Sequence, residues 1–507
     1  MIGNMIPTTQ IQNIFHNIQM VTQEILDFLK DDNQFLIIDG PAGTGKTTLI
    51  SNLIVEAKKL GLTSDAIAYT GKAASNLRNK CNGVGKTIHS FLYTFTPQLN
   101  KDDDTFNRGW SINLKGLDIL FVDECSMISN RVQGFNVNKE KTYLLVELLT
   151  AVKNNKIKKI MLVGDSYQLP PIIKESKKDS NNLEEPLYPD SLNEYFIESK
   201  YNLKGLKINL DENRRYQKNM EVYNLSFEVR NEIITKQSFD ESPKKWLKPR
   251  ISKDKFLTND RDVVDWIVEK GKDLNFTNVR VLTYTNEKAD EWNRKIRTAL
   301  GKIDKTTGEV EEITINEPLM NLVNKEYSKF YNGDTFIVTE FIGEDRKLSG
   351  ESECNDHPSC KNKTNRPPSL NIIKAKIRVV NEDSQEEKIV QIVNRAVVAN
   401  DTSSKEAYNH RLWCDFATQN SELYKNRNKS EESLEEWNNA RSNDEQYGSG
   451  VVSYAYASTV HKTQGDSFPY VVVDLEDENK NLKWLYTSLT RSTKDLVFYR
   501  KKTGLFR

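Results

Sequence analysis

The chain has 507 residues, which corresponds to about three to four domains of ordinary size. Hydrophobic residues make up 37% and charged residues 28%, a composition typical of a globular protein with several cores. The 72 Lys and Arg residues balance the 72 Asp and Glu residues, which excludes a polybasic protein whose entire surface binds polyanions. One basic groove remains compatible with this neutral total.

The cysteine content and the hydropathy pattern indicate a soluble intracellular protein. No run approaches the roughly 20 apolar residues that a membrane helix needs. The N-terminus lacks the charged start and apolar core of a signal peptide. The cysteines are sparse and odd in number, which argues against a disulfide framework and for a reducing compartment. They are Cys81, Cys125, Cys354, Cys360 and Cys414.

The first predicted element with a chemical signature is a phosphate-binding loop. An apolar run at residues 35–38 predicts a buried strand, and residues 49–60 predict a helix. Between them, residues 40–48 read GPAGTGKTT, which matches G-x-x-x-x-G-K-[ST] in its required strand–loop–helix context. Such glycines let backbone N–H groups turn toward phosphate oxygens, and the helix start adds a favourable field. The residues expected to bind the nucleotide are Gly40, Gly43, Thr44, Gly45, Lys46, Thr47 and Thr48.

A second predicted strand supplies acidic groups. Residues 118–122 are apolar after Asp118 and end at Asp123 and Glu124. Lys46 is expected to reach the β- and γ-phosphates, and the Thr47 hydroxyl to ligate Mg²⁺. Asp123 can also hold Mg²⁺, while Glu124 can polarise the attacking water. The sequence therefore predicts a triphosphate-binding protein that uses Mg²⁺.

Eight segments then occur in the order found in superfamily 1 helicases, and the chain resembles their 5′-to-3′ branch, which includes RecD-like and Dda-like enzymes. Tyr69 stands where that family usually has proline. Besides the phosphate loop, the segments are AYTGKAASNL (68–77), TIHSFL (87–92), VDECS (122–126), LVGDSYQLPPI (162–172), LDENRRY (210–216), YASTVHKTQGDSF (456–468) and YTSLTRS (486–492). LTYTNEKADEWN (282–293) resembles a further segment of the family.

The resemblance implies an α/β fold with two RecA-like P-loop NTPase domains. A small β-hairpin pin is expected as an insertion in the first domain, and an SH3-like and tower insertion in the second. The expected limits are 1–90 and 117–205 for domain 1A, 91–116 for the pin (1B), 206–300 and 450–507 for domain 2A, and 301–449 for the insertion (2B).

The resemblance also implies further residues at an ATP site. Gln168 is expected to sense the γ-phosphate, and Arg215 and Arg491 to close on the transferring phosphoryl group. Arg214 is adjacent and is an alternative to Arg215. Gly465, with Gln464, is expected to couple nucleotide to DNA.

A glutamine near the N-terminus is expected to read the adenine. Gln19 stands at about the right distance before the phosphate loop. Gln10, Gln12 and Gln23 are alternatives in the same glutamine-rich stretch.

A track for single-stranded DNA is expected from segments that follow predicted strands. Hydroxyls, lysines and rings suit contacts with a strand's backbone and bases, although Thr, Asn and His also cap turns. The expected contacts are Thr70, Lys72, His89, Ser90, Thr285, Asn286, Thr459, His461 and Lys462. In residues 91–117, whose alternation predicts a hairpin, Phe106 or Trp110 could act as a wedge against the duplex, although an aromatic in a hairpin more often packs in a core.

The insertion has the least legible pattern. We predict a strand over residues 331–338 with Asn332-Gly333 as a turn, an exposed loop over 343–371, strands within 372–398, and helix over 406–443. The helical part has Trp413, Leu423 and Trp437 at apolar positions. Cys354, His357 and Cys360, with Cys414, could seed a zinc site, but their spacing fits no standard framework.

The expected function is an ATP-dependent motor that moves 5′-to-3′ along single-stranded DNA and separates duplex. Its polarity rests on the resemblance alone. A translocase that strips proteins, a nucleotide-switched scaffold that does not travel, and an RNA motor remain alternatives. Single-stranded DNA and junctions are the expected partners, with a single-strand-binding protein as a candidate. We expect a monomer in the cytoplasm of a bacterial or phage-infected cell, neither secreted nor membrane-bound.

Overall fold

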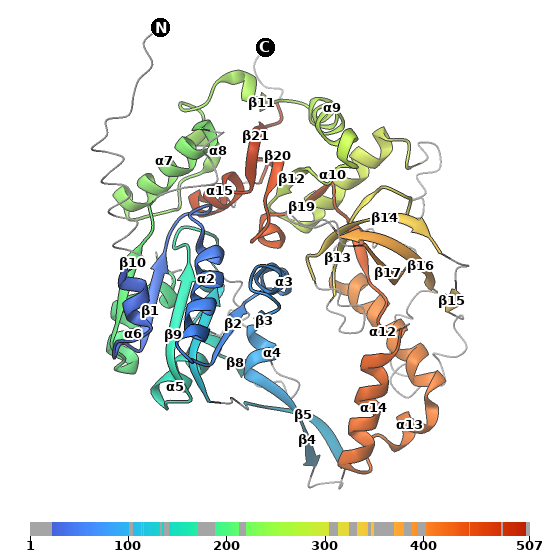
Figure 1. Ribbon diagram of the computed structural model, residues 1–507. Helices are drawn as coiled ribbons and strands as arrows, with labels where there is room; N and C mark the ends of the chain where they lie inside the picture. Colours follow the sequence, from blue (N-terminus) through green and yellow to red (C-terminus); the bar gives the residue numbers. More distant parts are fainter. Residues whose placement is uncertain are drawn as a thin grey trace. The chain divides into compact units, whose positions relative to one another are not determined.

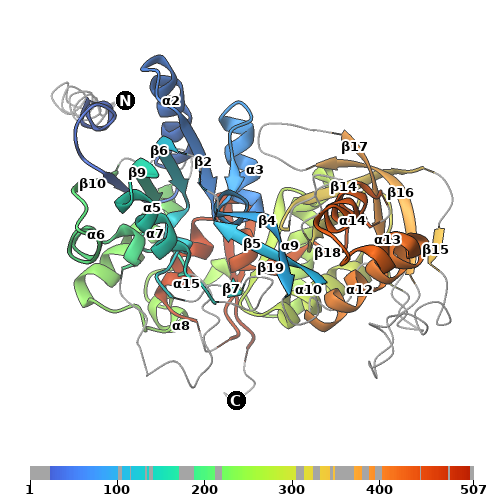
Figure 2. The same ribbon diagram turned by 90° about the horizontal axis from the view of Figure 1, so that it is seen from below.

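The computed structural model divides into two compact units (Figure 1 and Figure 2). Unit 1 comprises Met1–Thr94 and Ile112–Arg215, and unit 2 comprises Phe95–Ser111 and Tyr216–Arg507. The structure describes residues 23–100, 105–112, 114, 116–131, 134–135, 141–170, 188–211, 220–303, 313–323, 332–342, 346–348, 370–379, 387–393, 402–445, 447–477 and 480–502.

Unit 1 is built on a parallel sheet that has, among the described residues, the strand order β10-β1-β9-β6-β2-β3. Parallel strands need crossover connections, and helices supply most of them here. The strands are β1 (Phe35–Asp39), β2 (Ser64–Ala68), β3 (Lys86–Thr87), β6 (Leu117–Asp123), β9 (Ile157–Gly164) and β10 (Gly205–Asn209). The helices are α2 (Lys46–Lys59), α3 (Gly71–Lys80), α4 (Ile88–Leu92), α5 (Leu144–Lys153) and α6 (Glu194–Tyr201). The short strands β7 (Gly134–Phe135) and β8 (Lys141–Thr142) pair separately.

Both faces of this sheet are buried. Successive side chains of a strand point to opposite faces, so Leu36 of β1 packs in one core with Ile50 of α2. Its neighbour Ile37 packs in the other core with Leu148 of α5. A parallel sheet covered on both sides confirms the predicted α/β fold.

Two boundaries differ from the expected ones. Helix α2 begins at Lys46 rather than at residue 49, because the phosphate loop leads directly into it. Strand β10 pairs with β1, so the first sheet extends past residue 205. The division into domains 1A, 1B, 2A and 2B otherwise stays a prediction.

Unit 2 contains a second parallel sheet, with the order β11-β21-β20-β12-β19 in the described part of the chain. Its strands are β11 (Phe256–Leu257), β12 (Val279–Thr283), β19 (Ala457–Thr459), β20 (Phe468–Asp474) and β21 (Ser492–Tyr499). The helices of this part are α7 (Met220–Lys236), α8 (Pro243–Leu247), α9 (Asp260–Gly271), α10 (Asn286–Ala299) and α15 (Leu482–Leu489).

An antiparallel sheet lies between β12 and β19 in the sequence. The described strands pair as β15-β16-β14-β13-β18, and β17 also pairs with β16. Asn332 and Gly333 form the predicted turn, and Gly333 has a φ of 95°. The strands are β13 (Pro318–Asn321), β14 (Thr335–Phe341), β15 (Arg346–Leu348), β16 (Leu370–Val379), β17 (Glu387–Val393) and β18 (Val452–Tyr454).

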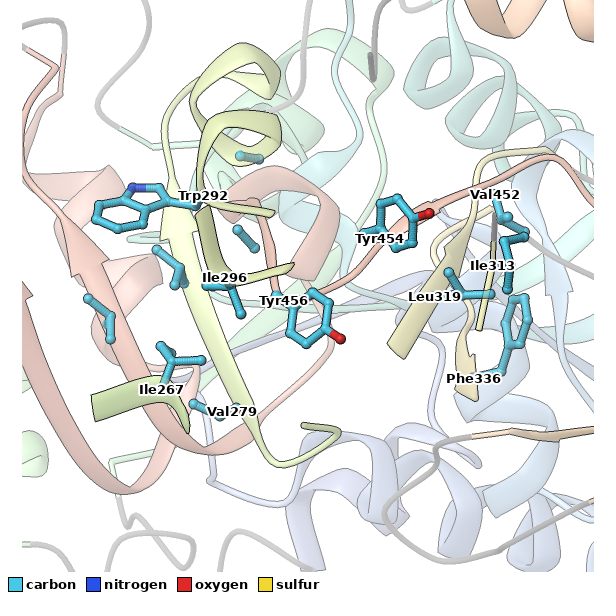
Figure 3. Packing of buried hydrophobic residues seen from close by; sticks show 14 of the residues in the cluster. Ile267, Val279, Trp292, Ile296, Ile313, Leu319, Phe336, Val452, Tyr454 and Tyr456 are labelled. Atoms are coloured by element: carbon cyan, nitrogen blue, oxygen red, sulfur yellow. The ribbon is translucent and has the colours of Figure 1, made fainter. Parts of the chain in front are cut away.

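The parallel and antiparallel sheets of unit 2 share one hydrophobic core. Val279 of β12 and Trp292 of α10 belong to the same buried cluster as Leu319 of β13 and Phe336 of β14. In Figure 3, Tyr456 lies between the side chains from the parallel sheet and those from the antiparallel sheet. The insertion is therefore packed against the parallel sheet rather than appended to it.

The predicted helical region of the insertion is confirmed, with two breaks. It forms α12 (Thr402–Gln419), α13 (Ser421–Asn426) and α14 (Glu431–Asn443). Phe416 and Trp437 pack together, with ring centroids 4.9 Å apart. The predicted pin is a two-stranded sheet of β4 (Tyr93–Asn100) and β5 (Thr105–Ile112). None of the described helices is long and apolar enough to cross a bilayer.

A buried ion pair joins α10 to the residue that precedes β13 of the antiparallel sheet. Arg297 of α10 donates to the Glu317 carboxylate at 2.5 Å, and both side chains are at most 1% exposed. Removing one member of such a pair leaves a buried charge, so Glu317→Ala should lower the free energy of unfolding by about 3–5 kcal/mol. Denaturant unfolding measures this loss. Glu291→Ala, which breaks more exposed pairs with Lys288 and Lys295, should cost less than about 1 kcal/mol. Equal losses in the two variants would contradict a special cost of breaking the buried pair.

Candidate nucleotide-binding and strand-binding sites

The predicted site residues of unit 1 follow strands of one parallel sheet. Because all its strands run in the same direction, their carboxyl ends lie along one edge. Asp39 of β1 is in register with Gly164 of β9, and Ala68 of β2 with Asp123 of β6. The phosphate loop, the acidic pair and the Gln168 segment therefore leave the sheet at the same edge as the segments of Thr70 and His89.

The phosphate loop has a backbone that glycine allows. Gly45 caps helix α2 with a φ of 85°, a left-handed conformation that other residues adopt at a cost. Gly40 has a different constraint, because a Cβ there would lie 2.8 Å from the Leu210 carbonyl oxygen. The start of α2 is thus placed directly after β1, with its N–H groups facing the loop.

Lys46 is buried and folds back over the loop. Its Nζ donates to the carbonyl oxygens of Gly40 at 2.7 Å and Pro41 at 2.9 Å. The Thr44 hydroxyl also donates to Pro41, at 3.0 Å. The ammonium is therefore held beside the loop by two neutral carbonyl oxygens. Charged phosphate oxygens form stronger hydrogen bonds with an ammonium and can replace them.

Thr47 and Asp123 come together from different elements. The Thr47 hydroxyl donates to Asp123 Oδ2 at 2.9 Å. Burial raises the pKa of the Asp123 carboxyl, while this hydrogen bond and the charge of Lys46 oppose the rise. A hydroxyl and a carboxylate in contact are hard oxygen ligands of the kind that Mg²⁺ prefers.

Glu124 has an unusual backbone. Its φ is 50° and its ψ 39°, a left-handed conformation that is uncommon for a non-glycine residue. Its backbone N–H donates to Asp123 Oδ1 at 2.9 Å. Strain of this kind concentrates at functional sites, and the sharp turn directs Glu124 away from the line of β6.

The Gln168 segment is tied to the phosphate strand by a contact that the sequence did not predict. The Asp39 carboxylate accepts from the Ser166 backbone N–H at 3.0 Å and from its hydroxyl at 2.6 Å. Lys207 of β10 lies 3.2 Å from the same carboxylate. Gln168 itself donates to Asp165 at 3.2 Å, and its Oε1 has no hydrogen-bond partner among the described residues. The sequence signal that could have predicted this contact was Asp39 itself, an aspartate at the end of β1 directly before the glycine-rich loop.

The residues of unit 1 that are predicted to contact single-stranded DNA differ in exposure. His89 and Ser90 are exposed, and the His89 ring lies 6.4 Å from Tyr69 and 6.2 Å from Tyr93 between centroids. Lys72, by contrast, is only 4% exposed. Thr70 caps helix α3 by accepting from the Ala73 N–H at 3.1 Å, which is the capping alternative considered from the sequence.

The predicted strand contacts of unit 2 lie at the carboxyl edge of its parallel sheet. Thr285 follows β12 and caps α10 by accepting from the Lys288 N–H at 3.2 Å. Asn286 begins that helix and is exposed. Thr459 ends β19, in register with Thr283 of β12, and is buried. His461 and Lys462 follow in a 3₁₀ turn, Val460–Thr463, where burial lowers the pKa of His461.

Arg491 is buried and bonded within unit 2. Its guanidinium donates to the carbonyl oxygens of Thr463 at 3.2 Å, Asp466 at 3.0 Å and Thr487 at 3.1 Å. Gly465 lies in the turn that Arg491 holds and has a φ of 86°. The arginine segment and the segment of His461 and Lys462 are therefore directly connected.

Several predicted residues lie outside the described part of the structure. These are Gln10, Gln12, Gln19, Arg214, Arg215, Cys354, His357 and Cys360, together with the side chains of Phe106 and Trp110. Gln23 is described, and its amide donates to Asp27 at 2.8 Å on an exposed helix surface. Cys414 is buried, with its sulfur 3.5 Å from His410 Nε2. The described residues contain no cluster of three or more His, Cys, Asp or Glu that could hold a metal.

Two family models match the chain. Residues 23–174 match a model described as an AAA domain, and residues 454–499 match the UvrD-like helicase C-terminal domain. The matches include the phosphate loop and the acidic pair in the first unit, and the turn of Lys462 and Arg491 in the second.

Curated relatives match over different lengths. The ATP-dependent DNA helicase dda of Enterobacteria phage T4 is 25% identical over 493 residues, covering 94% of this chain and 96% of that protein. The ATP-dependent DNA helicase Pif1 of Campylobacter jejuni is 25% identical over 351 residues, covering 62% and 68%. An uncharacterized protein, MJ1519 of Methanocaldococcus jannaschii, is 32% identical over 163 residues, and the chain spans only 13% of its length.

A solved structure supports the same fold. The crystal structure of Pif1 helicase from Bacteroides in complex with ADP-AlF3 and ssDNA covers 95% of this chain, and the match covers 92% of that protein. The TM-score is 0.50 at 16% sequence identity. The two parallel sheets, the ordered motifs and the match along almost the whole of a phage helicase agree, and the chain is therefore similar to the Dda and Pif1 helicases, as its motifs predicted.

Proposed function

We propose that the chain is an ATP-dependent helicase that moves 5′-to-3′ along single-stranded DNA and separates duplex ahead of it. The observation that carries this proposal is the shared carboxyl edge of the unit 1 sheet. That edge presents the Lys46, Thr47 and Asp123 constellation together with exposed His89 and Ser90. Triphosphate chemistry and a strand contact at one sheet edge give hydrolysis a short route to the DNA.

The nucleotide chemistry follows from the contacts of the loop. Lys46 and the N–H groups of residues 43–48 would bind phosphate oxygens, and Thr47 and Asp123 would hold Mg²⁺. The bound ion would neutralise charge on the phosphates. Glu124 would orient the attacking water, and Gln168 would report the γ-phosphate. Arg491 and Arg215 are proposed to stabilise the transferring phosphoryl group, and Gln19 to read the adenine.

The DNA contacts are proposed from both units. Thr285, Asn286 and Thr459 present hydroxyl and amide groups to phosphates, and His461 and Lys462 add a ring and a charge. Phe106 or Trp110 would meet the junction. We further propose a monomer that works in the cytoplasm of a bacterial or phage-infected cell, with a single-strand-binding protein as a candidate partner.

The decisive experiment is unwinding of two matched partial duplexes, one with a 5′ single-stranded tail and one with a 3′ tail. ATP-dependent separation of the 5′-tailed substrate alone is expected. Separation of the 3′-tailed substrate would overturn the polarity. Rapid, DNA-stimulated ATP turnover with no separation of either would favour a protein-displacing translocase, and slow turnover indifferent to DNA would favour a nucleotide-switched scaffold. An RNA-tailed duplex tests the choice of nucleic acid.

Lys462→Glu should weaken binding of a single-stranded oligonucleotide. Loss of one phosphate contact lowers the slope of log affinity against log salt by about one. Fluorescence anisotropy between about 50 and 200 mM salt measures this slope. Lys272→Glu is a matched control, because exposed Lys272 precedes β12 at the opposite edge of the same sheet. An unchanged slope for Lys462→Glu would remove that lysine from the proposed track.

A further inference from the structure

Arg280 is a buried charge that the proposed function does not use. It lies on β12, an inner strand of the parallel sheet of unit 2, in register with Val471 of β20, and is 0% exposed. Its neighbours Val279 and Val281 belong to the hydrophobic core, so alternation directs Arg280 to the opposite face of the sheet. None of its three guanidinium nitrogens has a hydrogen-bond partner among the described residues.

Two groups near the Arg280 guanidinium, the Phe468 ring and the Asp466 carboxylate, come from one short segment. The guanidinium lies over the Phe468 ring, 4.7 Å from its centroid. Burial lowers the pKa of Arg280 to about 10, and the nearby charge of Asp466 opposes the shift, so the side chain stays cationic at neutral pH. A buried cation without hydrogen bonds costs several kcal/mol, and a side chain with this cost calls for a role beyond packing.

The same segment is held by Arg491. Arg491 Nη1 donates to the carbonyl oxygens of Thr463 and Asp466. The Phe468 N–H donates to the Arg491 carbonyl oxygen at 2.7 Å. The segment of residues 463–468 therefore interacts with two arginines. The Arg491 guanidinium is bonded to the carbonyls of Thr463 and Asp466, and the Arg280 guanidinium lies over Phe468 and interacts electrostatically with Asp466.

We propose that Arg280 is a positioning residue that holds the 463–466 turn in place when the Arg491 guanidinium breaks its hydrogen bonds to that turn. This inference rests on the proposed function, in which Arg491 acts on the transferring phosphoryl group. To do so, the guanidinium of Arg491 must break its hydrogen bonds to the carbonyl oxygens of Thr463 and Asp466. Arg280 then pairs with the Asp466 carboxylate and keeps the turn, and with it His461 and Lys462, in register. The state of the bound nucleotide and the affinity for DNA are thus coupled, because Arg280 replaces Arg491 as the arginine that holds this turn.

Arg280→Met tests this exchange, because methionine fills the space without the charge. Two ratios are measured: ATPase rate with and without an oligonucleotide, and oligonucleotide affinity with and without a non-hydrolysable ATP analogue. Both ratios should fall about tenfold, within the usual size of a coupling between two sites. Thermal stability should hold or rise, because replacing a buried lone cation by an apolar side chain removes its desolvation cost. If Arg280 had only a structural role, Arg280→Met would lower thermal stability and leave both ratios unchanged.

Two further variants secure the interpretation. Asp466→Asn keeps the backbone carbonyl bonded to Arg491 but removes the charge, and Asp466 is partly exposed, so this variant carries the test if Arg280→Met fails to fold. It should reproduce the loss, and the double variant should be no worse than either single one. Arg294→Met, at an exposed arginine of α10, is the control and should behave as the original chain.

The outcomes separate the inference from the function. Wild-type ratios in both Arg280→Met and Asp466→Asn would overturn the exchange and leave the proposed helicase intact. An original chain whose ATPase ignores oligonucleotide would overturn both.

Discussion

Lys46→Ala should abolish ATP hydrolysis, with a fall in turnover of at least about 10²-fold, the usual effect of losing one group that stabilises a transition state. The reason is local, since Lys46 Nζ is held at the phosphate loop by the carbonyls of Gly40 and Pro41. Alanine removes the charge that would reach the β- and γ-phosphates. Release of phosphate, with and without oligonucleotide, measures the effect.

Lys58→Ala is the matched control for this variant. Lys58 is an exposed lysine in the last turn of the same helix, α2, and its removal should leave turnover unchanged. Full activity of Lys46→Ala would end the argument for a nucleotide at this loop. Equal losses in both variants would instead point to a defect in the helix.

Glu124→Gln should bind ATP and DNA yet turn over about 10²–10⁴-fold more slowly, the range for loss of a general base. The substitution keeps the size of the side chain and removes its negative charge and its ability to accept a proton. Nucleotide binding should survive because the Thr47–Asp123 contact and the Lys46 contacts do not involve the Glu124 side chain. Single-turnover hydrolysis, together with binding of a fluorescent ATP analogue, separates the two effects.

Glu56→Gln provides the comparison for Glu124→Gln. Glu56 forms a surface pair with Lys59 on α2, at 2.7 Å, and should tolerate the amide with no change in turnover. Normal turnover by Glu124→Gln would move the base to another residue, and lost ATP binding would make Glu124 a binding residue.

The local elements of the site could be predicted from the sequence. A strand, a glycine-rich loop and a helix are encoded by neighbouring residues, so the phosphate loop was identified with only the start of α2 misplaced. Asp123 and Glu124 were likewise expected at the end of a strand. The fold class came from the resemblance of the ordered motifs to those of superfamily 1 helicases, and the parallel sheets of both units agree with it.

The remaining features depend on residues far apart in the chain. The motif of Lys72 predicts a contact with single-stranded DNA, yet its side chain is buried on α3. The left-handed backbone of Glu124 and the hold of Asp39 on Ser166 arise where separate strands end side by side. Arg280 reads from the sequence as an ordinary charged residue, and only the neighbouring strands show that it is enclosed.

The common core of the two sheets in unit 2 has a mechanical consequence. Trp292 and Val279 from one sheet, and Leu319 and Phe336 from the other, form a single packed cluster, and the Arg297–Glu317 pair crosses the same seam. Close-packed interiors resist compression and pass strain onward instead of absorbing it. A force applied to the antiparallel sheet would thus be transmitted to β12 and α10 through rigid packing. The insertion and β12, which carries Arg280, would therefore move together as one rigid part.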